Sequence, residues 1–218
     1  MTSRTAVFGR HRRICAVLAA LLLLPATACT GGGSTPGATA APESPGPTAS
    51  PTSSATPTPT ASYKPADASG RAQNVPVPVL PEAAKAETKE GLEAFARYWF
   101  QLLSYGYETG DVTRIGEITS PACRACERAK AVISGWNEGG RWLVGGKVET
   151  PSVSTTFVVA PDGNYQVAVQ GSQAAISYYN ADGTLHQADP KPDDTGNLML
   201  AVFRDGAWYV NNIQPIVG

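Results

Sequence analysis

The sequence has few of the residues and motifs that carry enzyme chemistry. It holds two histidines in 218 residues, and it has no nucleophile elbow, no phosphate-binding glycine loop and no HExxH motif. His186 is the only histidine after residue 28, and its place beside a polar loop is typical of the surface. The acidic residues from Asp189 to Asp194 do not follow the spacing of an EF-hand loop. We therefore predict no catalytic residues, no metal site and no cofactor.

Basic residues are scarce after the first 28 residues, and they form no run. The whole chain has 17 Lys+Arg and 18 Asp+Glu. Four arginines and no acidic residues lie in residues 1–28, so the remainder has 13 basic and 18 acidic residues and a formal charge of −5. The lack of a basic patch argues against nucleic acid as a partner, and against polybasic binding to anionic lipid.

The one long apolar run, Ile14–Leu24, is too short to span a membrane comfortably. It follows the four arginines and precedes Ala26-Thr27-Ala28-Cys29, an order that predicts a signal peptide at residues 1–28. Ala-x-Ala is an ordinary signal-peptidase site. Small residues before a cysteine also form a lipobox, after which Cys29 becomes the lipidated N-terminus. Arg12-Arg13 leaves twin-arginine export open as the route.

We favour lipidation of Cys29. Without it, Cys29 would be a free thiol outside the cell if Cys123 and Cys126 form a bridge. Thr30–Gly33 supplies the flexible start expected of a tether. The lipobox therefore predicts a protein on the extracytoplasmic face of the cell membrane, with the membrane as a partner through the N-terminal lipid.

A biased segment separates this anchor from the rest of the chain. From Thr30 to Ser62 every residue except Glu43 is Gly, Ala, Ser, Thr or Pro. Such a composition cannot bury enough apolar surface to offset the entropy of ordering. We predict a disordered linker over residues 29–79, either a tether that also suits O-glycosylation or a spacer whose exact sequence does not matter.

Helical patterns follow the linker. Asp111 is placed to cap a short helix that ends near Ile118. Ser120-Pro121 is a start signal for a third helix, which runs to about Trp136. Before both, apolar residues recur at intervals of three and four and predict a long amphipathic helix. Its expected buried stripe is Leu92, Phe95, Ala96, Trp99, Leu102 and Leu103.

A CxxC pair, Cys123 and Cys126, falls on the first turn of the third predicted helix, where this spacing puts both sulfurs on one face. Three interpretations are open: a structural disulfide, a dithiol redox site, and a reduced or metal-bound pair. We favour the disulfide. A redox CxxC is expected after a strand, and a closed zinc site needs four ligands. A loop this small stabilises by roughly 2 kcal/mol.

Period-two patterns begin at Arg141 and predict strands joined by Asp-Gly turn signals. Helices first and strands afterwards predict an α+β domain over residues 80–218, with the helices packed on a curved, mostly antiparallel sheet. The candidate strands are Trp142–Val148, Val153–Val159, Tyr165–Val169, Gln173–Tyr179, Thr184–Gln187, Leu198–Phe203 and Trp208–Ile213.

The lipobox, the Thr/Pro/Ser linker, the run AFARYWFQLLSYGYETGD and the following SPACRAC resemble an uncharacterised family of actinobacterial lipoproteins. The resemblance covers roughly Val79 to Gly218. The order of elements also looks like the NTF2-like cone, in which helices wrap a curved sheet around a pocket. That resemblance implies a cavity. Glu108, a carboxylate near the end of the long helix, is expected to lie in solvent. The aromatic candidates for a pocket lining, or alternatively for core and rim positions, are Trp99, Tyr105, Tyr107 and Tyr178.

Two functions from different classes follow. The favoured one is a non-catalytic lipoprotein domain that binds an envelope protein, a cell-wall component or a small apolar ligand. The alternative is an extracytoplasmic enzyme that uses a pocket carboxylate for acid/base chemistry or the CxxC for thiol redox chemistry. A homodimer through the sheet stays open as a further partner, because the NTF2-like resemblance implies one.

Overall fold

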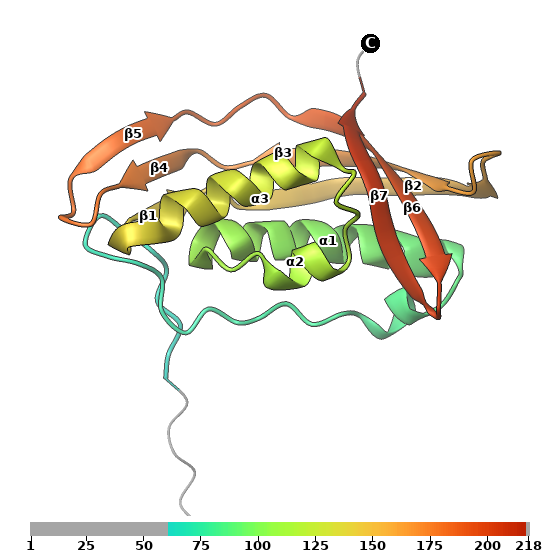
Figure 1. The fold of residues 1–218 in the computed structure, drawn as a ribbon, viewed down its shortest axis with the longest axis horizontal. Helices are drawn as coiled ribbons and strands as arrows, with labels where there is room; N and C mark the ends of the chain where they lie inside the picture. The colour runs from blue at the N-terminus through green and yellow to red at the C-terminus, as the bar shows by residue number, and fades with distance from the viewer. Residues whose placement is uncertain (1–60, 217–218) are drawn as a thin grey trace, which may run out of the picture. The chain divides into compact units, whose positions relative to one another are not determined.

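The computed structural model of the protein describes residues 61–216 (Figure 1). The chain divides into two units, Met1–Ala55 and Thr56–Gly218, and every described residue lies in the second. The predicted signal peptide, Cys29 and the linker up to residue 60 lie outside the described residues. No helix within residues 61–216 is long and apolar enough to cross a membrane.

Helices precede strands in the chain, as the sequence predicts. The helices are η1 (Glu82–Lys85), α1 (Lys89–Thr109), α2 (Thr113–Glu117), α3 (Arg124–Asn137) and η2 (Glu138–Gly140). The strands are β1 (Trp142–Gly145), β2 (Val148–Val159), β3 (Tyr165–Gln173), β4 (Ile176–Tyr179), β5 (Leu185–Asp189), β6 (Thr195–Arg204) and β7 (Ala207–Pro215).

Local signals set both ends of α1. The Thr88 hydroxyl accepts a hydrogen bond from the Gly91 N–H at 3.0 Å and caps the first turn. Gly110 ends the helix with a left-handed φ of 83°, and its N–H bonds back to the Gly106 carbonyl. The predicted apolar stripe is buried, with Phe95 2% exposed, so the long amphipathic helix is confirmed.

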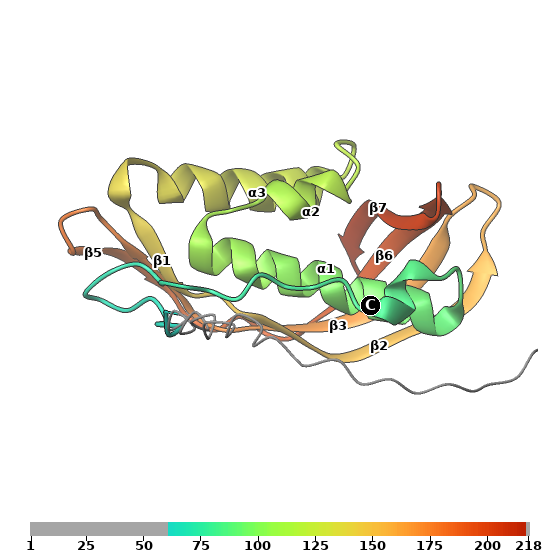
Figure 2. The ribbon, with the colours of Figure 1, turned by 90° about the horizontal axis from the view of Figure 1, so that it is seen from below.

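The strands form two antiparallel sheets, one in the order β1-β4-β5 and the other in the order β2-β3-β6-β7. Along β3 burial alternates: Tyr165, Val167 and Val169 are buried, and the residues between them are exposed. In Figure 2, α1 and α3 lie on the same side of β2 and β3, and the strands curve beneath them. The buried face of β3 meets α1, so the mixed α+β class with helices on one face of antiparallel strands is confirmed.

Tryptophan and its aromatic neighbours anchor the centre of the core. Trp208 on β7 is 2% exposed, and its ring lies edge-on to Tyr165 and Phe203 at centroid distances of 5.1 and 4.9 Å. Its indole N–H donates to the Ala86 carbonyl at 3.1 Å, which ties the C-terminal strand to the chain just before α1. A buried indole needs such a partner, and here the partner lies far away in the sequence, near the start of the described chain.

The structure divides one predicted strand. Trp142–Val148 becomes β1 and the start of β2, because Gly145 and Gly146 adopt positive φ angles of 86° and 73° between them. An added Cβ at Gly145 would lie 2.1 Å from the Ala175 carbonyl oxygen. The chain therefore turns here only with glycine, and β1 joins a different sheet from β2.

The described structure begins before residue 80, where the sequence predicts the start of the α+β domain. Residues 61–79, which we call the N-terminal strap, lie along the domain (Figure 1). The Trp142 indole donates to the Asp67 carbonyl at 2.9 Å, and the Arg71 guanidinium donates to the Asn137 side-chain oxygen at 2.7 Å. The restricted linker composition ends at Ser62. The strap that follows carries Asp67 and Arg71, whose groups form these two hydrogen bonds.

Candidate functional site

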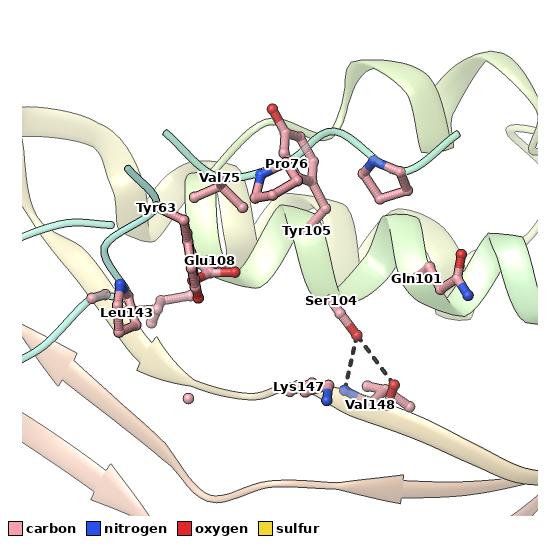
Figure 3. A pocket seen from close by; sticks show the side chains of 14 residues that line it. Tyr63, Val75, Pro76, Gln101, Ser104, Tyr105, Glu108, Leu143, Lys147 and Val148 are labelled. Carbon is pink, nitrogen blue, oxygen red and sulfur yellow. Dashed lines mark hydrogen bonds between the residues drawn. The ribbon is translucent and has the colours of Figure 1, made fainter. Parts of the chain in front are cut away.

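A cavity of about 520 Å³, which we call the strap cavity, lies between the N-terminal strap, α1 and the first two strands (Figure 3). The strap contributes Tyr63, Pro65, Ala66, Val75, Pro76 and Pro78; α1 contributes Gln101, Ser104, Tyr105 and Glu108; the β1–β2 region contributes Leu143, Gly145, Lys147 and Val148. Three segments that are distant in sequence therefore close one space.

The helix contributes a single stripe to this cavity. Gln101, Ser104, Tyr105 and Glu108 stand at positions i, i+3, i+4 and i+7, which share one face of a helix. This stripe is separate from the one that packs into the core, so α1 is buried on one side and lines the cavity on another.

Ser104 connects the helix to the wall made by β2. Its hydroxyl donates to the Val148 carbonyl at 3.3 Å and accepts from the Val148 N–H at 2.9 Å (Figure 3). The same hydroxyl also lies 3.0 Å from the Phe100 carbonyl of its own helix. These contacts hold the start of β2 against α1, and Leu143, 1% exposed, completes an apolar wall beside them.

The strap makes the remaining wall, and its lining is largely proline and valine. Proline has no backbone N–H, so Pro65, Pro76 and Pro78 present apolar rings without a donor. Tyr63 adds an aromatic ring, and its hydroxyl donates a hydrogen bond to the Glu108 carboxylate (Figure 3). This bond joins the strap to α1 at the polar end of the cavity.

The Tyr63–Glu108 contact stabilises the protonated form of the tyrosine. The hydrogen bond to Glu108, followed by burial and by the negative charge of Glu108, raises the pKa of Tyr63 to about 12. Tyrosine is protonated near neutral pH even at its ordinary pKa of about 10, so the raised pKa extends the role of Tyr63 as a donor to alkaline pH. Glu108 itself is half-buried, contrary to the expectation that it lies in solvent.

The aromatic pocket candidates do not come together in one site. Tyr105 lines the strap cavity, and Tyr107 lines a separate cavity of about 320 Å³ with Phe100 and Gln173. Tyr178 lies edge-on to Trp136, with ring centroids 5.2 Å apart. Burial, and then a hydrogen bond with a neighbouring carboxylate, raise the pKa of Tyr178 to about 12.

Trp99 lines none of the four cavities described in residues 61–216. It is 3% exposed and belongs to the core. Its indole N–H donates to the Thr119 hydroxyl at 2.8 Å, and that hydroxyl donates to the Ile115 carbonyl at 2.6 Å. Of the two alternatives for this residue, pocket lining or core, the structure has Trp99 in the core.

Cys123 and Cys126 are joined by a disulfide, with Cα atoms 5.3 Å apart. The two residues are 0% and 3% exposed. The Cys123 sulfur also accepts the N–H of Cys126 at 3.3 Å and so caps α3. Exchange with an external thiol needs access to sulfur, and the burial of this pair favours the structural interpretation.

Sequence reasoning missed the strap side of the cavity. The prolines of residues 63–78 indicate a linker, although Tyr63 is the first aromatic residue after the restricted composition ends. The helical stripe from Gln101 to Glu108 is also visible in the sequence. It gives no signal by itself, because polar residues at helical spacing are normally a solvated face. His186 is exposed, as expected of a surface residue.

Comparison with solved structures finds similar chains with low scores. The intermembrane space region of the chloroplast protein ARC6 is 9% identical, with 60% of this chain and 98% of that chain covered and a TM-score of 0.41. The protein Aln2 from a Streptomyces species is 10% identical, with 57% and 88% covered and a TM-score of 0.36. At such scores these similarities carry no argument about fold or function.

A third similar structure is a putative calcium/calmodulin dependent protein kinase II association domain from Xanthomonas campestris, 13% identical, with 58% and 84% covered and a TM-score of 0.30. Comparison with curated proteins finds no match. The model of a family of unknown function, DUF6318, matches residues 61–214 and so includes the N-terminal strap. The chain therefore belongs to the family of unknown function DUF6318.

Proposed function

We propose that the protein is a lipid-anchored extracytoplasmic binding protein whose domain holds a small, largely apolar ligand in the strap cavity without catalysing a reaction. The observation that carries the proposal is the cavity itself, about 520 Å³ and lined by three separate segments. Small-molecule sites in proteins typically measure about 300–1,000 Å³ and combine apolar walls with a few polar groups. The strap cavity has that size and that lining.

The polar groups of the cavity favour binding over catalysis. Ser104 is engaged with the backbone of β2, and the Glu108 carboxylate is engaged with the Tyr63 hydroxyl. No histidine or cysteine lines the cavity. Both groups are held by hydrogen bonds within the cavity lining, so we assign them to orientation of the ligand.

The cellular position in this proposal rests on the sequence alone. The signal peptide and lipobox place the lipid on Cys29, and the linker then carries the domain away from the membrane surface. The NTF2-like assignment is also part of the proposal, supported by helices on one side of curved antiparallel strands with a cavity beside the long helix. A domain held on a tether suits the capture of a ligand or of an envelope partner outside the cell.

A blocking substitution tests the cavity. Ala66 lines the cavity, and Ala131 is an exposed residue of α3 away from it. We expect the uncharged ligand 1-hexanol to shift backbone amide resonances of the strap and α1 in the purified protein. Ala66→Trp should abolish these shifts by filling the space, and Ala131→Trp should leave them unchanged. Equal shifts in both variants would refute the cavity as the binding site.

Metabolic labelling tests the anchor. Cells of an actinobacterial host that express the full chain should incorporate labelled palmitate into the protein. The Cys29→Ala substitution should remove the label. Membrane fractionation should then move the variant to the soluble or secreted fraction. Retention of label after Cys29→Ala would contradict the assignment of the lipid to that cysteine.

A further inference from the structure

We infer that the ligand of the strap cavity is an organic cation, an amine or quaternary ammonium group on an apolar body, which places its charge against Glu108. This inference rests on the proposed function, since it names the chemical class of the ligand for the same cavity. Its basis is the charge balance of the cavity lining, the two tyrosines in that lining and the absence of hydrogen-bond donors on the proline rings of the strap wall.

One acidic and one basic residue line the cavity, and they are unequally compensated. Lys147 lies 3.1 Å from the Glu149 carboxylate, and that pair is well exposed, at 71% and 68% of the side-chain surface. Glu108 is half-buried, and none of the ion pairs within residues 61–216 includes it. The cavity therefore carries a negative charge that no described cation neutralises.

The hydrogen bonding of Glu108 leaves one oxygen for a ligand. The Tyr63 hydroxyl donates to Oε1, and within residues 61–216 no group donates to Oε2. The free oxygen of the half-buried Glu108 carboxylate attracts a cation by charge and by hydrogen bonding. An anionic ligand would be repelled by the same charge, and a neutral alcohol would gain a hydrogen bond without the ionic attraction.

One aromatic ring contacts this carboxylate, and a second lines the same cavity. Tyr105 precedes Glu108 by three residues on α1 and shares its face of the helix, and Tyr63 reaches Glu108 from the strap (Figure 3). Tyrosine faces attract cations through the ring quadrupole, and aromatic rings are a common site for ammonium groups. The apolar remainder of the ligand would lie along Leu143, Val75 and the strap prolines.

Three ligands of equal chain length test this inference on the mature protein: 1-hexylamine, 1-hexanol and hexanoate at pH 7, each measured by calorimetry. We expect hexylamine to bind at least about tenfold tighter than hexanol, with hexanoate the weakest. Glu108→Gln should reduce the ratio of hexylamine to hexanol affinity to about one. Glu90→Gln, an exposed acid on the same helix, should leave the ratio unchanged.

The outcomes separate the two proposals. If hexanol binds in the cavity and hexylamine binds no tighter, the cation is wrong and the binding function stands. If hexanoate binds tightest, Lys147 rather than Glu108 is the anchor, and the inference is overturned. If none of the three binds, both proposals fail. A salt titration of the unmodified protein gives a test without a variant: only hexylamine binding should weaken as salt rises.

Discussion

Removal of the N-terminal strap should separate folding from ligand binding. A chain that starts at Leu80 lacks six of the 14 residues that line the strap cavity. The buried core residues run from Ala84 to Ile213, so none of them is lost. We expect the shortened chain to fold, to be less stable than a chain that starts at Ala61, and to lose affinity for 1-hexanol.

The expected loss of stability follows from the contacts of the strap. Trp142 is 6% exposed, and removal of the strap takes away the Asp67 carbonyl that accepts its indole N–H. A buried donor left without a partner costs about 1–3 kcal/mol. The Arg71–Asn137 bonds are exposed, so they add little. Release of the ordered strap offsets part of the loss through chain entropy, and the net expectation is a loss of about 1 kcal/mol.

Urea denaturation of both chains measures this difference, and the amide titration with 1-hexanol measures binding. A shortened chain that does not fold would show that the strap is part of the core. A shortened chain with unchanged stability and unchanged binding would refute the strap as a wall of the site. Lower stability with unchanged binding would keep the packing of the strap and reject its part in the cavity.

Three other perturbations test the surrounding structure. Thr119→Val removes the acceptor of the buried Trp99 indole and should lower the unfolding free energy by about 1–3 kcal/mol in urea denaturation; a loss under about 0.5 kcal/mol would contradict that bond. Gly110→Ala should destabilise by about 1–2 kcal/mol, because φ is +83° and the new Cβ would lie 2.7 Å from an α3 side chain. The matched Gly135→Ala, in the open part of α3, should stabilise by about 0.5–1 kcal/mol. The pKa of Tyr63 is raised to about 12 by its carboxylate hydrogen bond and by burial, above about 10 in the unfolded chain. Its stabilisation is therefore complete below about pH 10 and lost as pH rises through about 12, so the difference in Tm between wild type and Tyr63→Phe should vanish over that window; a constant difference would contradict the bond.

Local sequence patterns predict the helices well, and their success has a simple cause. The stripe of α1 repeats at the period of a helix, and Thr88 and Gly110 supply its caps from within a few residues. Such signals act over one or two turns and need no distant partner. Strand patterns are equally local, but the sequence places Gly145 and Gly146 inside one predicted strand. In the structure the chain turns at these two glycines and passes from one sheet to the other.

The site is harder to predict because its walls come from separate segments. Proline near a linker indicates an extended chain, and only the contacts of Trp142 and Glu108 distinguish an extended strap from a tether. The sequence allows Trp99 a place on the buried stripe of α1 and in a pocket lining, because helical periodicity does not distinguish a cavity from the core. The hydrogen bond from Trp99 to Thr119, which lies just after α2, shows that the indole faces the core.

The sequence alone determined the α+β class, the long amphipathic helix and the pairing of Cys123 with Cys126 as the favoured interpretation. It is also the whole basis for the predicted signal peptide and the proposed lipid on Cys29, because those signals are short and contiguous. Tertiary structure alone decided that the strap closes a cavity over α1 and that Glu108 lies inside it without a described cation. Burial and charge balance are properties of segments brought together by folding, and no local pattern encodes which segments meet.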